Sequence, residues 1–160
     1  PGVGSFRQAI KHLKINNFDK EILNFLQLKN KGVLGICLGM QLFFESSEEF
    51  GFTKGLGILE GKVKKFEINI DRVPHIGWNK IKFKKQNKIF DKDLNNKNFY
   101  FVHSYYCKPN NKKSILSSTK YNDVDFCSSI LEKNILATQF HPEKSGKYGV
   151  KFLKKIIRIL

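Results

Sequence analysis

One cysteine of this sequence stands where an apolar segment meets the start of a helical pattern. Residues 31–36 predict a short buried strand, and Cys37 follows them with Gly35 and Gly39 two positions to either side. A nucleophile at a strand-to-helix junction lies on a sharp turn, and the flanking glycines let the backbone pass closely. We expect the helix N-terminus to lower the pKa of the thiol and the N–H of Leu38 to face a developing oxyanion. A buried structural cysteine would also fit this apolar pattern.

A second segment favours the catalytic interpretation. His141 follows the apolar residues 137–140, and Pro142 and Glu143 come directly after it. A cysteine nucleophile needs a base within hydrogen-bond reach and a third group that orients the base. Because proline cannot continue a strand ladder, the chain turns at Pro142 and holds the carboxylate of Glu143 against the imidazole. Cys37, His141 and Glu143 are therefore predicted to form a catalytic triad.

The segments around these residues predict alternating strands and helices, as in an α/β protein. Ser5 and Asp19 are the predicted N-caps of the first two helices. Helices are predicted at 5–13, 19–29, 38–45 and 146–160, and strands at 56–59, 63–70, 79–83, 98–106, 113–120, 125–132 and 134–140. We expect a mostly parallel central sheet flanked by helices, with a small antiparallel extension and the site at the C-terminal ends of the strands.

The length and composition favour a single domain, residues 1–160. A chain of 160 residues with 41% hydrophobic residues and 15 phenylalanines can bury a core. No stretch approaches the ~20 apolar residues of a membrane-spanning helix. Three cysteines without metal-type spacing favour a reducing compartment, the cytoplasm, over a disulfide framework. Cys107 and Cys127 are predicted to be inert packing residues.

The net charge of +15 raises the alternative of nucleic-acid binding. Nearly all of this positive charge is lysine, and the arginines are Arg7, Arg72 and Arg158. Arginine is the residue that forms bidentate contacts with phosphates and base edges. The scattered lysines therefore do not favour a nucleic acid as the partner.

Six short motifs relate the sequence to one enzyme family. They are GICLGMQ at 35–41, QFHPE at 139–143, PGVGSF at 1–6, PHIGWN at 74–79, FVHSYY at 101–106 and HPEKS at 141–145. With these motifs the chain resembles the class I (triad) glutamine amidotransferases. Among them it is most similar to the HisH glutaminase subunits of imidazole glycerol phosphate synthase.

The resemblance implies an activity and a set of site residues. The activity is hydrolysis of L-glutamine to glutamate and ammonia, and the ammonia passes to a HisF-type cyclase subunit in a heterodimer for histidine biosynthesis, without a metal or a cofactor. The implied residues are catalytic (Cys37, His141, Glu143), oxyanion hole (Val3, Gly4, Leu38), glutamine-binding (Gly2, Gly39, Gln41, His103, Ser104, Tyr105) and partner-facing in the loop 73–79 (Pro74, His75, Trp78, Asn79).

Several alternatives stay open at the level of the sequence. The family's first strands and helix would precede the PGVG segment, so we expect the chain to be an N-terminally truncated fragment. A HisH-like amidotransferase could serve a HisF-like partner in surface-sugar biosynthesis. A γ-glutamyl hydrolase on the same fold is a further alternative, as is a lysine-rich binding module without enzymatic activity. His103 is a rival base, which we reject because no carboxylate lies near it in the sequence.

Overall fold

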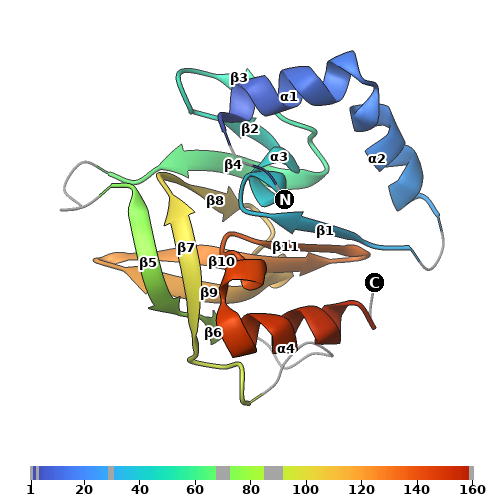
Figure 1. Cartoon of the computed structure of the whole chain (residues 1–160). Coiled ribbons are helices and arrows are strands. Elements are labelled where there is room, and N and C mark those ends of the chain that lie inside the picture. Colours follow the sequence, from blue (N-terminus) through green and yellow to red (C-terminus); the bar gives the residue numbers. More distant parts are fainter. Residues whose placement is uncertain (1, 3, 29–30, 68–72, 85–91, 159–160) are drawn as a thin grey trace.

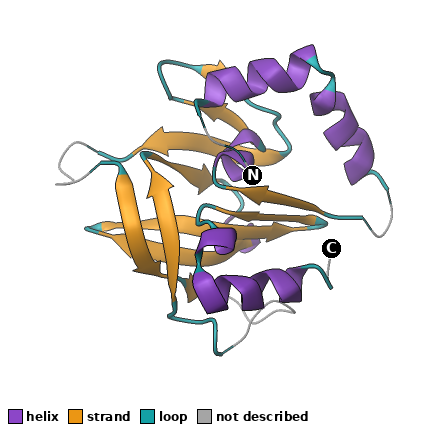
Figure 2. Ribbon diagram, in the orientation of Figure 1, coloured by secondary structure: helices purple, strands orange, loops and turns teal. Residues whose placement is uncertain are grey.

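The computed structural model describes residues 2, 4–28, 31–67, 73–84 and 92–158. The helices α1 and α2 lie on one side of the molecule and α4 on the opposite side, with the strands between them (Figures 1 and 2). The helical segments are α1 (Phe6–Ile15), α2 (Phe18–Leu26), α3 (Leu38–Leu42), α4 (Gly146–Ile156) and the 3₁₀ turns η1 (Lys112–Ser114) and η2 (Pro142–Lys144). The strands are β1 (Val33–Ile36), β2 (Phe44–Ser47), β3 (Thr53–Lys54), β4 (Leu59–Lys65), β5 (His75–Lys80), β6 (Lys82–Phe83), β7 (Asn98–His103), β8 (Tyr105–Pro109), β9 (Ile115–Tyr121), β10 (Val124–Glu132) and β11 (Ile135–Thr138).

The described strands form three sheets. Their orders are β1-β11-β10-β9-β6, β3-β2-β4-β8 and β5-β7. The pairs β1–β11 and β2–β4 are parallel, and the other pairs are antiparallel. The α/β class is as predicted, but the described strands do not make a mostly parallel sheet. The reason is that β9, β10 and β11 are joined by two-residue turns at 122–123 and 133–134, and such turns allow only antiparallel neighbours.

The first two helices begin in different ways. Ser5 caps α1, since its hydroxyl accepts the N–H of Gln8 at 3.4 Å, as predicted. The prediction of Asp19 as a cap is wrong. Asn17, in a left-handed conformation with φ of 56°, precedes α2 and makes no side-chain cap, and Asp19 lies in the first turn. A carboxylate at that position still interacts favourably with the helix dipole.

The turn that carries the cysteine is tightly packed. A Cβ at Gly35 would lie 2.6 Å from Cε2 of Phe43 and 2.9 Å from the carbonyl oxygen of Gly39, so only glycine fits there. The predicted helix through Glu45 is wrong, because β2 begins at Phe44. Phe44 is fully buried and β2 pairs with both β3 and β4, so sheet packing overrides local helix propensity.

The segment predicted as a loop at 73–79 is mostly a strand. β5 starts at His75 and pairs with β7 along its whole length, which places the two strands side by side (Figure 1). Its side chains alternate, so His75 is fully buried whereas Trp78 is 53% exposed. The predicted strand 79–83 is divided between β5 and β6, and 56–59 contributes only its last residue to β4.

Two hydrophobic clusters hold these layers together. One cluster joins α1, α3, β2 and β4. The other is rich in phenylalanine and joins α4 to the strands β6, β7, β9, β10 and β11. Phe152 of α4 is fully buried against Phe140 and Phe99. A Cβ at Gly149 would overlap the carbonyl oxygen of Pro142, so α4 packs directly on the η2 turn. Within the described part of the chain, no helix is long and apolar enough to cross a membrane.

Candidate active site

Cys37 lies between the end of β1 and the start of α3. Its φ of 53° is a left-handed conformation that only a few per cent of non-glycine residues adopt. The backbone N–H of Cys37 donates to the carbonyl of Thr138 at 2.7 Å, which holds the elbow against β11. Strained backbone of this kind clusters at functional sites. The Cys37 side chain at this elbow is 8% exposed.

His141 comes from the far end of β11. Its Nδ1–H donates to Oε1 of Glu143 at 2.6 Å, which is the contact expected from the His-Pro-Glu turn. Its Nε2 is buried and has no hydrogen-bond partner among the described residues. Its backbone N–H donates to the carbonyl of Tyr100 at 2.8 Å, and the hydroxyl of Ser145 donates to its carbonyl at 2.6 Å. With Nδ1 bonded to the carboxylate, Nε2 is the nitrogen left to accept a proton.

A cavity of about 250 Å³ brings the cysteine and the histidine together. Its volume lies below the roughly 300–1,000 Å³ of pockets that bury drug-sized ligands, so it fits a small metabolite. The cavity is lined by Gly2, Gly4, Cys37, Leu38, Gln41, Glu49, Val102, His103, Ser104, Tyr105 and His141. Segments more than 100 positions apart in the sequence thus meet at one site.

The thiol is protonated at rest. Burial raises the pKa of Cys37 to about 11, and this effect outweighs the lowering of the pKa by hydrogen bonds from the Leu38 N–H and the Gln139 side chain. The prediction of a lowered pKa is therefore wrong, because desolvation of the thiolate dominates at this site. The thiol donates instead to the carbonyl of Val102 at 3.8 Å. Such a nucleophile needs a base at the moment of attack.

Comparison with known proteins gives the family of this chain. A family model described as glutamine amidotransferase class-I matches residues 1–159. "Imidazole glycerol phosphate synthase subunit HisH" of Chlorobaculum tepidum is 46% identical over 154 residues, which are 96% of this chain and 76% of that protein. "Imidazole glycerol phosphate synthase subunit HisH 2" of Methanococcus maripaludis is 46% identical over 160 residues, which are 99% of this chain and 78% of that protein.

The chain belongs to the class-I glutamine amidotransferases, in their HisH branch.

Solved structures agree on the fold. A crystal structure of a glutamine amidotransferase superposes with a TM-score of 0.65 at 15% identity, over 95% of this chain and 75% of that one. A glutamine amidotransferase from Thermotoga maritima gives a TM-score of 0.62 at 17% identity, over 99% of this chain and 58% of that one. At these identities the likeness concerns the amidotransferase fold alone.

Two of the three predicted oxyanion residues of this amidotransferase, Gly4 and Leu38, line the cavity beside the cysteine. Leu38 follows Cys37 directly, and its N–H hydrogen-bonds the sulfur. Gly4 lines the cavity with φ of 106°, and nothing would contact a Cβ there within 4 Å. Gly2 forms an isolated parallel bridge with Cys37. Val3 lies outside the described residues.

Most of the predicted glutamine-binding residues line the same cavity. These are Gly2, Gln41, His103, Ser104 and Tyr105. Gly39 does not line it, because its carbonyl faces Gly35 inside the elbow. His103 is buried, and desolvation lowers its pKa to about 3, so its imidazole is neutral. Its Nδ1 is bonded to the carbonyl of Tyr105 at 2.8 Å, and its Nε2 lies 3.1 Å from Nδ1 of His75. Neither nitrogen of this ring is therefore bonded to a carboxylate among the described residues.

Sequence reasoning missed two polar residues of the site. Glu49 is not among the predicted site residues, yet it lines the cavity and accepts the backbone N–H of Phe6. Gln139 is fully buried, and its Nε2 donates to Sγ of Cys37 at 3.6 Å. Gln139 stands two positions before His141, and this proximity to the base is the one signal in the sequence that could have indicated it.

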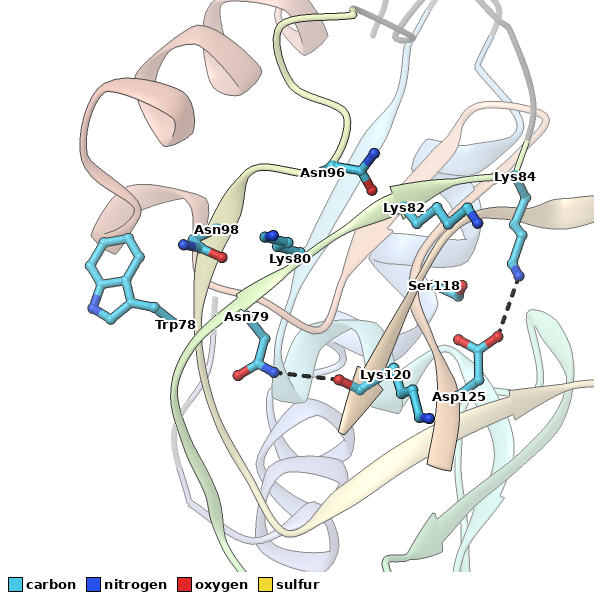
Figure 3. Close-up of a pocket in the computed structure, with 10 residues that line it drawn as sticks. All are labelled: Trp78, Asn79, Lys80, Lys82, Lys84, Asn96, Asn98, Ser118, Lys120 and Asp125. Carbon is cyan, nitrogen blue, oxygen red and sulfur yellow. Dashed lines mark hydrogen bonds and ion pairs between the residues drawn. The ribbon is translucent and has the colours of Figure 1, made fainter. Parts of the chain in front are cut away.

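Two of the four predicted partner-facing residues, Trp78 and Asn79, line a second, larger groove. Figure 3 shows this groove, of about 620 Å³, with Trp78 and Asn79 on its wall. Pro74 and Trp78 are exposed, as an interface residue must be. The prediction for His75 is wrong, since its side chain points inward from β5 and is fully buried.

Proposed function

We propose that this chain is the glutaminase subunit of an imidazole glycerol phosphate synthase. It hydrolyses L-glutamine to glutamate and ammonia and supplies the ammonia to a HisF-type cyclase subunit in histidine biosynthesis. One observation carries the proposal. The thiol of Cys37 and an unpartnered, buried Nε2 of His141 border the same small cavity, and Glu143 holds the other ring nitrogen. The HisH names of the relatives support the choice of pathway.

The first half of the reaction forms a thioester. The thiol of Cys37 turns from the Val102 carbonyl toward His141, and Nε2 accepts its proton as the sulfur attacks the side-chain carboxamide carbon of glutamine. The oxyanion that forms is stabilised by the N–H of Leu38 and by the glycine segment at Gly4. The C–N bond then breaks, and the imidazolium returns the proton to the departing nitrogen, which leaves as ammonia.

The second half hydrolyses the thioester. His141 removes a proton from a water molecule, whose oxygen attacks the acyl carbon, and the C–S bond breaks to give glutamate and the thiol of Cys37. The carboxylate of Glu143 fixes the ring orientation and stabilises the imidazolium in both halves. The proposed steps use side chains, backbone N–H groups and water.

The walls of the cavity provide groups for both ends of the substrate. Glu49 supplies a carboxylate among the described lining residues, and it suits the α-ammonium group of glutamine. Ser104, Tyr105 and Gln41 surround the same space and are proposed to hold the α-carboxylate and the amide. This arrangement favours a free amino acid over a larger amide.

The partner is proposed to be a HisF-type cyclase in a heterodimer. Pro74, directly before β5, and Trp78, within β5, are both exposed, and tryptophan is a frequent interface anchor. The three cysteines are all free, which suits the cytoplasm, where we place the reaction. Neither a nucleic acid nor a membrane is needed.

A paralogous pathway is the nearest competing function. Curated relatives carry the numbered names HisH 1 in Campylobacter jejuni, at 43% identity, and HisH 2 in Methanococcus maripaludis. A HisH-like chain that serves surface-sugar biosynthesis would have the same site. Growth of a histidine auxotroph lacking its own HisH distinguishes the two, because only a histidine-pathway subunit restores growth.

The decisive experiment on the chemistry replaces the nucleophile. Cys37→Ala should abolish glutamine hydrolysis in the presence of the cyclase, while synthesis from added ammonium salts persists. Cys107→Ala is the matched control, since Cys107 is also buried but lies outside the cavity, and it should retain glutaminase activity. Equal loss of both activities in Cys37→Ala would mark a structural cysteine. Nucleic-acid binding with a steep salt dependence, unaffected by Cys37→Ala, would favour a binding module.

A further inference from the structure

A chain of buried hydrogen bonds starts at the nucleophile and leaves the cavity. Gln139 donates through Nε2 to Sγ of Cys37 at 3.6 Å, and its Oε1 accepts from Nε2 of Gln41 at 3.1 Å. The same Nε2 of Gln41 donates to the carbonyl of Tyr105 at 3.0 Å. Gln139 is 0% exposed and Gln41 7%, so neither amide exchanges freely with solvent. The mechanism above assigns no role to Gln139.

The chain continues through two imidazoles to the surface. Nδ1 of His103 bonds to the same Tyr105 carbonyl at 2.8 Å, and Nε2 of His103 lies 3.1 Å from Nδ1 of His75. Nε2 of His75 lies 3.0 Å from Oδ1 of Asn79. Asn79 is half-buried and borders the large groove with Trp78. A continuous set of hydrogen bonds thus connects that groove to the sulfur.

Aromatic rings seal the two imidazoles on their faces and edges. His75 stacks on Tyr121 with ring centroids 3.9 Å apart and on Phe101 at 4.9 Å. His103 packs against Phe126 at 5.2 Å. In such surroundings an unmade hydrogen bond is costly, so each ring nitrogen is held to the partner it has.

The chemistry of the groups fixes the direction of the chain. A carbonyl oxygen cannot donate, so the Tyr105 carbonyl requires a proton on Nδ1 of His103. Burial lowers the pKa of both histidines, so each ring is neutral and carries one N–H. Nε2 of His103 therefore accepts from Nδ1–H of His75, and Nε2 of His75 must accept from the amide NH₂ of Asn79.

This requirement conflicts with the second bond of Asn79. Its Nδ2 donates to the carbonyl of Lys120 at 3.4 Å, the bond drawn as a dashed line in Figure 3. Its Oδ1 faces Nε2 of His75. Rotation of the amide by half a turn satisfies His75 and gives up the long bond to Lys120. The Asn79 amide can satisfy one neighbour or the other, and oxygen and nitrogen of an amide exchange places in such a rotation. The Asn79 amide, at the surface end of this set of hydrogen bonds, therefore has two orientations.

We propose that Gln139 is a positioning residue for the Cys37 thiol, and that the hydrogen bonds through Gln41, Tyr105, His103 and His75 tie its orientation to the Asn79 amide at the groove. The proposal deepens the proposed function, on which it rests for its meaning in catalysis. A group in the groove that bonds to Asn79 would then fix the orientation of its amide. The thiol would respond without direct contact, through the Tyr105 carbonyl, for which His103 and Gln41 compete as donors.

The test measures the reactivity of the thiol, which needs neither glutamine nor a partner. Cys37 is alkylated with iodoacetamide from pH 7 to pH 10, and peptide mass spectrometry follows each cysteine separately. Cys107 and Cys127 serve as internal references, because burial raises the pKa of both thiols and neither borders the cavity. The variants are Gln139→Met, His75→Phe and Asn79→Asp. The matched control is Ile76→Ala, an exposed neighbour on the same strand.

The expected effects decrease along the chain. Gln139→Met should slow alkylation of Cys37 about three- to tenfold and move its pH profile upward, because the thiolate loses a donor. His75→Phe and Asn79→Asp should change the rate of Cys37 alkylation about two- to threefold, while Ile76→Ala leaves that rate unchanged. An unchanged profile in Gln139→Met overturns the proposal, as does equality of the His75 and Asn79 variants with Ile76→Ala.

A measurement on the unmodified chain covers variants that fail to fold. Long-range ¹⁵N–¹H spectra of the imidazoles should show His103 and His75 as Nδ1–H tautomers. The Nε2–H tautomer at His103 contradicts the proposal. Glutaminase assays distinguish failure of the proposed function from failure of this inference. If wild-type protein with the cyclase hydrolyses no glutamine, the proposed function fails, whereas the alkylation series still decides whether the hydrogen-bonded chain exists.

Discussion

Two buried imidazoles border the same cavity, and their surroundings give them opposite properties. His141 holds a carboxylate on Nδ1 and has an unpartnered Nε2. His103 holds a carbonyl on Nδ1 and a second imidazole, His75, on Nε2. One ring has a nitrogen available to take a proton and a charge that stabilises the resulting cation. The other has both nitrogens occupied and a pKa lowered to about 3 by burial.

The difference shows that the partners of a ring, more than its burial, define a base. Both side chains are at most 6% exposed, and both lie beside the nucleophile. The carboxylate of Glu143 stabilises the cation that forms on His141 during the reaction, because an opposite charge offsets the cost of desolvation. Nothing of this kind is bonded to His103. We therefore expect these two histidines to respond very differently to substitution.

The strongest test of the contrast removes the base. His141→Ala should lower kcat for glutamine hydrolysis roughly 10⁴-fold, the upper end of the range for general acid–base catalysis. Cyclase-coupled glutamate release measures this loss. Ammonia-dependent synthesis by the cyclase should be retained, and co-elution of the variant with the cyclase shows that the variant is folded. A kcat within tenfold of wild type would exclude His141 as the base.

The second test keeps the ring and changes its orienting partner. Glu143→Gln preserves an acceptor for Nδ1–H but removes the negative charge, so kcat should fall about 10- to 100-fold, as for orienting partners in other sites. The pH profile of kcat should shift in the same experiment, because the imidazolium loses its counter-charge. Wild-type kcat in this variant would mean that the 2.6 Å contact with His141 has no catalytic role.

The third test changes the other imidazole. His103→Gln keeps an N–H donor near the Tyr105 carbonyl and should raise KM for glutamine up to about tenfold with a smaller change in kcat, because it alters a wall of the binding cavity. Steady-state kinetics with the cyclase separate the two parameters. Loss of kcat as large as in His141→Ala would exchange the roles assigned to the two rings.

The last test concerns stability at acid pH and not catalysis. The unfolded chain binds a proton at His103 below about pH 6.5, while the folded chain, with a pKa of about 3, does not. The stability that this neutral ring contributes is therefore complete above pH 6.5 and is lost as the pH falls toward 3, by at most about 1.4 kcal/mol per pH unit. Urea unfolding between pH 7 and pH 4 should show a shallower slope in His103→Gln. Identical slopes would contradict the buried neutral state.

The sequence predicted the parts of the site that depend on neighbours along the chain. Glycines around Cys37 indicate a tight elbow, and Pro142 places Glu143 against His141, so both features follow from local rules. The strands after residue 113 and the start of the final helix were also predicted close to their observed bounds, whereas the predicted strand 98–106 is divided at Ser104 between β7 and β8. In each case the periodicity or the turn residues lie within one short segment.

Features that depend on distant segments were missed. β5 is a strand because β7, some 20 residues later, pairs with it, and this pairing buries His75. Gln139 and Glu49 reach the cavity only through the packing of β11 and α1. The pKa of Cys37 was expected to fall because a helix follows it, but the enclosure that raises the pKa comes from the whole fold.

The backbone bridge between Tyr100 and His141 has a consequence for how the enzyme can be switched. The carbonyl of Tyr100 holds the backbone of His141, and Oε1 of Glu143 holds its ring, so a movement of the base would have to break both contacts. Gly2 and Gly4, in the lining of the same cavity, present no side chains. A signal that starts or stops catalysis would therefore disturb less of the structure at these glycines than at the base.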